Sequence, residues 1–207
     1  MSLAGSLKIA SRRVPLAYLI KPYQMIRSMV QQGQPSPYRK HRLIRELAER
    51  TGNRIFIETG TYLGDTLWSL KDSFKELYSV ELDRGLYEAA CRRFARYKDI
   101  HLFCGDSAAI LPKLLLPVKE PVLFWLDAHY SGGITTGDIS QSPVIRELDY
   151  ILSHQVKGHI VLIDDVASFG SDPAYPSLSV LKEYCIRRKP KSSMEVKDGI
   201  IVFFPEQ

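Results

Sequence analysis

The chain has 207 residues, of which 45% are hydrophobic and 25% charged, and its formal net charge is +5. A chain of this length and composition can bury a large core, so it needs neither disulfides nor a metal to fold as one domain. The three cysteines, Cys91, Cys104 and Cys185, are widely spaced and support neither a disulfide framework nor a zinc site.

Residues 1–51 are predicted to form an N-terminal helical extension or cap. Prolines interrupt its first part, where one short helix over 23–31 is expected. A stronger helix is predicted over 38–51, because apolar residues recur there at helical spacing and Gly52 follows as a stop. The basic and aromatic side chains of this extension suit a cover over a substrate or a homodimer contact, and equally ordinary surface packing.

Residues 52–207 alternate between short apolar strands and helices. The predicted strands are 55–58, 76–81, 100–104, 121–126 and 159–163. The predicted helices are 66–74, 86–97, 107–115, 142–153 and 177–188. Strands 193–196 and 200–204 flank an Asp-Gly turn, which indicates a closing hairpin. The pattern predicts an α/β fold with a Rossmann-like, doubly wound, mostly parallel sheet and a C-terminal antiparallel strand.

Acidic or glycine-rich residues follow all five strands that are predicted to be parallel. These segments are Glu58–Thr66, Glu81–Asp83, Gly105–Ser107, Asp127–His129 and Asp164–Asp165. Ligands of open parallel sheets bind outside the carboxyl ends of the strands. A purely structural protein has no reason to place a carboxylate at each strand end, so we predict a ligand site there.

The first of these segments, ETGTYLGDT, resembles the glycine-rich motif of S-adenosylmethionine-dependent methyltransferases. A plain tight turn would give the same pattern, which differs from the GxGxxG of dinucleotide-binding folds. The resemblance implies S-adenosylmethionine as cofactor. It assigns to cofactor binding the loop residues Glu58, Gly60, Thr61, Tyr62, Gly64 and Thr66. In this loop Gly60 would allow close backbone approach, and Glu58 would suit the cofactor's positive charges.

The next two strand ends are predicted to hold the nucleoside part of the cofactor. Glu81 would accept hydrogen bonds from the ribose hydroxyls, with Asp83 as the alternative. The turn at Asp106 and Ser107 resembles the family's adenine-binding turn. Asp106 would accept from the exocyclic amine, and it can cap the following helix at the same time.

Three carboxylates end the fourth and fifth strands and are expected to converge. Converging carboxylates raise each other's pKa, which a hard cation such as Mg²⁺ relieves. The pattern resembles the metal-dependent O-methyltransferases of the catechol and macrolide-sugar (macrocin) types. That resemblance implies a magnesium ion held by Asp127, Asp164 and Asp165. Helix capping, or cofactor contacts without a metal, are the alternatives, and Asp127 is also assigned to cofactor binding.

The implied reaction is transfer of the sulfonium methyl group to a substrate hydroxyl. The catechol type carries a lysine three residues after its fourth-strand acid as general base, whereas Tyr130 stands there in this chain. His129 is our first choice of base, because histidine titrates near neutral pH, and Tyr130 is the second. With Asp127 these residues form the predicted catalytic set. The composition of residues 130–143 suits a substrate loop.

We expect the acceptor to be a hydroxyl on a glycan or small molecule, a sugar first and a catechol-like compound second. A nucleotide-binding oxidoreductase is an alternative, disfavoured by the missing GxGxxG and by the final hairpin. An RNA methyltransferase or nucleic-acid-binding protein is another; the +5 charge allows it, but no RNA-binding motif supports it. A non-catalytic relative is disfavoured by the intact strand-end acids.

The sequence contains no predicted targeting segment. No apolar run approaches the ~20 residues of a membrane span. The short apolar run 14–20 ends at Lys21-Pro22 without a small-residue cleavage site, which is a poor secretory signal. We therefore expect a cytoplasmic protein.

Overall fold

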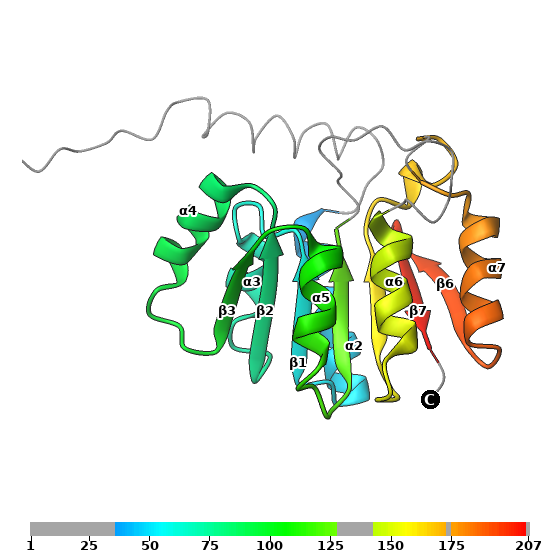
Figure 1. Cartoon of the computed structure of the whole chain (residues 1–207), viewed down its shortest axis with the longest axis horizontal. Coiled ribbons are helices and arrows are strands. Elements are labelled where there is room, and N and C mark those ends of the chain that lie inside the picture. Colours follow the sequence, from blue (N-terminus) through cyan, green and yellow to red (C-terminus); the bar gives the residue numbers. More distant parts are fainter. Residues whose placement is uncertain (1–35, 128–142, 173–174, 206–207) are drawn as a thin grey trace, which may run out of the picture. The chain divides into compact units, whose positions relative to one another are not determined.

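The computed structural model describes residues 36–127, 143–172 and 175–205 (Figure 1). The chain divides into two compact units, Met1–Ser36 and Pro37–Gln207, and the described residues fall almost entirely in the second. The predicted helix over 23–31 and most of the predicted substrate loop lie outside the described residues, as do His129 and Tyr130.

Seven strands form one sheet in the order β3-β2-β1-β4-β5-β7-β6 (Figure 1). Their bounds are β1 (Ile55–Thr59), β2 (Glu76–Glu81), β3 (Ile100–Cys104), β4 (Val122–Leu126), β5 (Ile160–Ile163), β6 (Ser193–Lys197) and β7 (Ile200–Phe204). Strands β1 to β5 are parallel, whereas β7 runs antiparallel to both β5 and β6. The predicted doubly wound sheet with a closing antiparallel hairpin is confirmed.

Helices cover both faces of the sheet. Their bounds are α2 (Pro37–Thr51), α3 (Asp65–Leu70), α4 (Arg84–Phe94), α5 (Ser107–Leu115), α6 (Pro143–Ser153) and α7 (Leu178–Arg188), with a short 3₁₀ helix η2 (Val166–Ser168). Buried side chains of α2, α3 and α4 pack on one face, and those of α5, α6 and α7 on the other. Because both faces are covered, β4 and β5 are apolar throughout, and β1 is apolar up to Glu58. No helix in the described ranges has the length and apolar character that a membrane crossing requires.

Several helix bounds differ from the prediction, among them the end of α4 at Phe94 instead of residue 97, and two of the differences have a clear local reason. Helix α3 ends at Leu70 instead of residue 74, since the Ser73 N–H donates to the Leu70 carbonyl at 2.8 Å and closes a turn. Helix α4 begins at Arg84, two residues early, because the Asp83 side chain accepts a hydrogen bond from the Leu86 N–H at 2.8 Å. Asp83 is therefore a helix cap.

Helix α2 packs as part of the sheet unit. Its apolar stripe, which includes Leu43, Ile44 and Leu47, is buried in the core cluster that also contains Phe56 and Trp125. The predicted boundary between an N-terminal extension (residues 1–51) and the domain that follows concerns the function of the extension as well as its packing. This boundary stays a prediction. The packing brings the first turn of α2 to the carboxyl edge of the sheet, which we define as the edge where β1 to β5 end.

Candidate functional site

The turn after β1 closes directly against the end of β4. These strands are neighbours, and Gly60 has a φ of 137°, a backbone conformation that favours glycine. A Cβ at position 60 would lie only 2.9 Å from the Cβ of Asp127. The structure therefore brings Gly60 and Asp127 together, and any larger residue at position 60 would have to displace the Asp127 side chain.

Glu58, beside this turn, is a fully buried carboxyl group. Its Oε1 accepts a hydrogen bond from the Ser79 hydroxyl at 2.7 Å, and Ser79 also contacts the Thr61 hydroxyl at 2.5 Å. Among the residues that the structure describes, no hydrogen-bond partner reaches the buried Oε2. Burial raises the pKa of Glu58 well above its usual value, and the carboxylates of Asp127 and Glu81 raise it further. A cationic ligand group would relieve this arrangement.

The glycine-rich turn is tied to the end of β2 through Glu81. The Tyr62 N–H donates to Glu81 Oε2 at 2.7 Å, and the Asp83 N–H donates to Oε1 at 2.8 Å. Tyr62 has a φ of 47°, which is unusual for a bulky residue. Both Glu81 oxygens are thus held in place, while a carboxylate retains further lone pairs that hydroxyl groups can use.

Gly64 and Thr66 begin the helix after this turn. Gly64 has a φ of 78°, and a Cβ there would lie 2.7 Å from the ring of Phe94 in α4. Thr66 is half-buried in the first turn of α3. Gly64 therefore serves close packing between α3 and α4.

Asp106 caps α5, as the capping alternative predicted. Its Oδ1 accepts from the Ala108 N–H at 3.0 Å, and its Oδ2 lies 3.5 Å from Arg146 Nη2. Because the Asp106 side chain is 50% exposed, it also remains accessible to a ligand. The neighbouring Ser107 hydroxyl points the other way and donates to Glu147.

Glu147 is a buried carboxyl group that the sequence reading did not single out. It lies in α6, is 4% exposed, and accepts hydrogen bonds from Ser107 and, at 3.3 Å, from Thr59. Burial raises its pKa from 4.5 to about 8; these hydrogen bonds lower it, and Asp106 and Asp127 raise it. The signal was present in the sequence, since Glu147 interrupts the otherwise apolar stripe of an amphipathic helix.

Asp164, one of the three predicted metal ligands, forms an ion pair with a lysine. Asp164 Oδ2 lies 2.5 Å from the Nζ of Lys40, and Asp164 Oδ1 accepts from the Asp165 N–H at 2.9 Å. Asp165 itself has a φ of 58° and precedes η2. Burial raises the pKa of Asp164, whereas the Lys40 ammonium acts in the opposite direction. Within the described part of the chain, no group of three His, Cys, Asp or Glu side chains is placed to hold a metal ion. Because the Lys40 ammonium already compensates Asp164, the described residues do not fit Mg²⁺ at that carboxylate.

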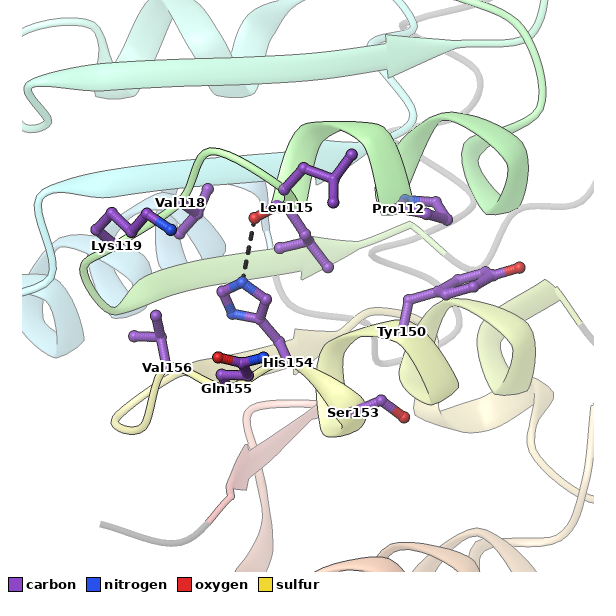
Figure 2. Close-up of a pocket in the computed structure, with 10 residues that line it drawn as sticks. Pro112, Leu115, Val118, Lys119, Tyr150, Ser153, His154, Gln155 and Val156 are labelled. Atoms are coloured by element: carbon purple, nitrogen blue, oxygen red, sulfur yellow. Dashed lines mark hydrogen bonds between the residues drawn. The ribbon is translucent and has the colours of Figure 1, made fainter.

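The opposite edge of the sheet carries a cavity of a different kind. Figure 2 shows it between α5 and α6, near the amino ends of β4 and β5. Its volume is about 350 Å³. Leu115, Tyr150 and Val156 are among its lining residues, which include no carboxylate. The strand-end acids and the glycine turn lie at the carboxyl edge, so we place the candidate functional site there.

Two histidines close that opposite edge. His159 Nδ1 accepts from the Val122 N–H at 3.0 Å, so its Nε2 carries the proton and donates to His154 Nδ1 at 2.8 Å. His154 Nε2 then donates to the Leu115 carbonyl at 3.1 Å, the dashed line in Figure 2. Both histidines therefore have a structural role at the edge away from the strand-end acids.

Solved methyltransferase structures share this fold. The O-methyltransferase TomG from Streptomyces achromogenes, solved in complex with SAM, has a TM-score of 0.59 at 20% identity, over 81% of this chain and 80% of that one. The chain has a methyltransferase fold. An O-methyltransferase from Bacillus cereus in complex with SAH has a TM-score of 0.58 at 15% identity, over 94% of this chain and 92% of that one.

A third methyltransferase fold match comes from Geobacter sulfurreducens, with a TM-score of 0.59 at 13% identity, over 96% of this chain and 92% of that one. No protein-family model and no curated protein matches the sequence. The resemblance to class I O-methyltransferases that the sequence motifs indicated is thus matched by the fold.

Proposed function

We propose that this chain is an S-adenosylmethionine-dependent O-methyltransferase. The observation that carries the proposal is the glycine turn in which the Gly60 backbone packs directly against Asp127, beside a buried Glu58 oxygen that lacks a hydrogen-bond partner among the described residues. Both features suit a ligand that approaches the backbone closely and carries positive charge. The structural neighbours that were solved with SAM or SAH support the choice of ligand.

The cofactor's parts would be divided among the strand ends. Glu58 would face its ammonium group, Glu81 would accept from the ribose hydroxyls, and Asp106 would accept from the adenine amine. When bound, the cofactor supplies a methyl group on an electrophilic sulfonium. Protein donors hold the carboxyl groups of Glu58 and Glu81 in place before the ligand arrives, which lowers the cost of ordering them.

The acceptor would be a hydroxyl on a glycan or small molecule, as the sequence resemblance implies. We propose His129 as the general base that takes the hydroxyl proton, with Tyr130 as the second choice and Asp127 beside them. Orientation of the acceptor toward the methyl group would supply a large part of the rate enhancement. We assign no step to a metal ion, because Lys40 already pairs with Asp164.

The first test is calorimetric titration of the full chain with S-adenosylhomocysteine. We expect micromolar binding in the wild type and at least a 100-fold loss in Gly60→Ala, because the new Cβ would overlap Asp127. Gly52→Ala is the matched control, since Gly52 also has a positive φ, of 76°, but an added Cβ meets nothing within 4 Å. Binding of NAD instead of S-adenosylhomocysteine would support the oxidoreductase alternative and contradict our proposal.

A further inference from the structure

A buried lysine occupies the position where the sequence predicted a metal ion. Lys40 lies in the first turn of α2, and its Nζ is 2.5 Å from Asp164 Oδ2 at the end of β5. Both side chains are 8% exposed, so water screens the pair poorly. The other Asp164 oxygen accepts the Asp165 N–H.

This contact changes the charge balance of the strand-five acids. A divalent cation bound at Asp164 would have to displace the Lys40 ammonium or lie close to it, and the two positive charges would repel. Displacement would leave a buried ammonium without its partner, which is strongly unfavourable. Lys40 thus already provides the compensation for which a metal was invoked.

We infer that Lys40 replaces the divalent cation at the end of β5, so that this chain binds its cofactor and transfers the methyl group without a metal. The inference rests on the proposed function for the reaction, but its charge argument concerns Lys40 and Asp164 alone. Lys40 is a positioning residue: it holds Asp164, and through the Asp165 N–H the turn that follows β5. Activation of the acceptor then depends on protein groups.

The first experiment follows Mn²⁺ by electron paramagnetic resonance in a titration of the full chain, with and without saturating S-adenosylhomocysteine. We expect the free Mn²⁺ signal to match that of buffer, and the dissociation constant of S-adenosylhomocysteine to differ less than twofold between EDTA and Mg²⁺. A stoichiometric Mn²⁺ site that Asp164→Asn abolishes would overturn the inference. A chain that binds neither ligand would contradict the proposed function and leave the Mn²⁺ result as expected.

The second experiment removes the ammonium with Lys40→Met. We expect Mn²⁺ binding to become detectable, with an affinity at least tenfold above the upper limit that the wild-type titration sets, because Asp164 then lacks the Lys40 ammonium. Lys40→Arg should retain wild-type behaviour. We also expect Tm to fall by roughly 10 °C and to recover at least half of that loss in Lys40→Met/Asp164→Asn. Lys98→Met, at an exposed position, is the control. Unchanged Mn²⁺ affinity in Lys40→Met would contradict the inference.

Discussion

The two edges of the sheet both bury polar side chains, but they satisfy them differently. At the amino edge, each ring nitrogen of His154 and His159 has a hydrogen-bond partner, and the chain of donors ends at a backbone carbonyl. At the carboxyl edge, Glu58 keeps an oxygen without a partner in the described structure, and Glu147 is buried with a strongly raised pKa. The hydrogen-bonding capacity of the two histidine rings is thus fully used, as is usual for buried polar groups.

The backbone shows the same contrast. At the amino edge, the positive-φ positions before β1 and β5 are Gly52 and Gly158, which adopt this conformation without strain. Among the described residues, the non-glycines with positive φ are Tyr62, Asp165 and Asp198, all in turns at the carboxyl edge. Strained backbone conformations cluster at functional sites, so the strain at the carboxyl edge supports the placement of the functional site there.

The largest effect that would sharpen this comparison is expected at Glu147. Its folded-state pKa of about 8 lies above its ordinary value of 4.5, so its contribution to stability is full below pH 4.5 and is lost as pH rises through 8. Glu147→Gln should remove this loss, a difference of up to about 5 kcal/mol in the free energy of unfolding at pH 9. Urea denaturation of both proteins across pH 5–9 checks it; parallel curves would contradict the raised pKa.

The next effect concerns the amino edge and has the opposite sign. Burial lowers the pKa of His159 from 6.5 to about 4, and the nearby His154 and Lys189 contribute. The unfolded chain binds the proton first, so stability falls as pH drops from 6.5 to 4, by on the order of 3 kcal/mol. His159→Gln should flatten this acid limb in urea denaturation, whereas His101→Gln should retain it. A limb of equal depth in both variants would refute the assignment.

A smaller effect is expected in ligand binding at Glu58. A ligand ammonium favours the ionised carboxyl, whose pKa is raised in the free chain, so binding releases a proton and tightens as pH rises toward that pKa. Glu58→Gln should weaken S-adenosylhomocysteine binding roughly 10-fold to 100-fold and abolish the proton release. Calorimetry in two buffers of different ionisation enthalpy measures both. Proton release that persists in the variant would assign the effect to another group.

The smallest effect tests backbone strain at Tyr62. Tyr62→Gly and Tyr62→Ala remove the same ring, but only glycine adopts a φ of 47° freely. The glycine variant should therefore be the more stable of the two by about 1 kcal/mol in urea denaturation. At the amino edge the substitution runs the other way. Gly158→Ala introduces a side chain at a positive φ and should lower the free energy of unfolding by a similar amount. Equal stability of the two Tyr62 variants would remove strain as a feature of the site.

Local sequence patterns predicted most of the fold. Apolar runs marked every strand of the sheet within a residue or two, and Asp198-Gly199 marked the hairpin, where both residues have positive φ. The placement of Gly60 and Asp127 at one edge followed from the parallel strands, because the carboxyl ends of such strands meet at one edge. Their direct contact follows from the β1–β4 pairing, which the structure supplies. These features depend on residues near in sequence or on topology alone.

The contacts that decide the chemistry were beyond such patterns. Lys40 pairs with Asp164 across 124 residues, and Thr59 bonds to Glu147 across 88. From the local sequence, Lys40 and Glu147 are each charged positions on an amphipathic helix. Only the packing of these helices on the sheet shows that both side chains face inward. Lys40 does lie three residues before the buried Leu43, hence on the same helical face. A charged residue on the apolar face of a predicted helix therefore indicates a buried charge.

The position of β7 has a consequence for biosynthesis. It is the last strand to be made, yet it lies between β5 and β6 and pairs with both. While the chain is still being translated, β5 therefore presents an unpaired edge, the kind of surface on which nascent chains associate with one another. The pairing of β5 is therefore complete only once Ile200–Phe204 has been synthesised and has reached the sheet.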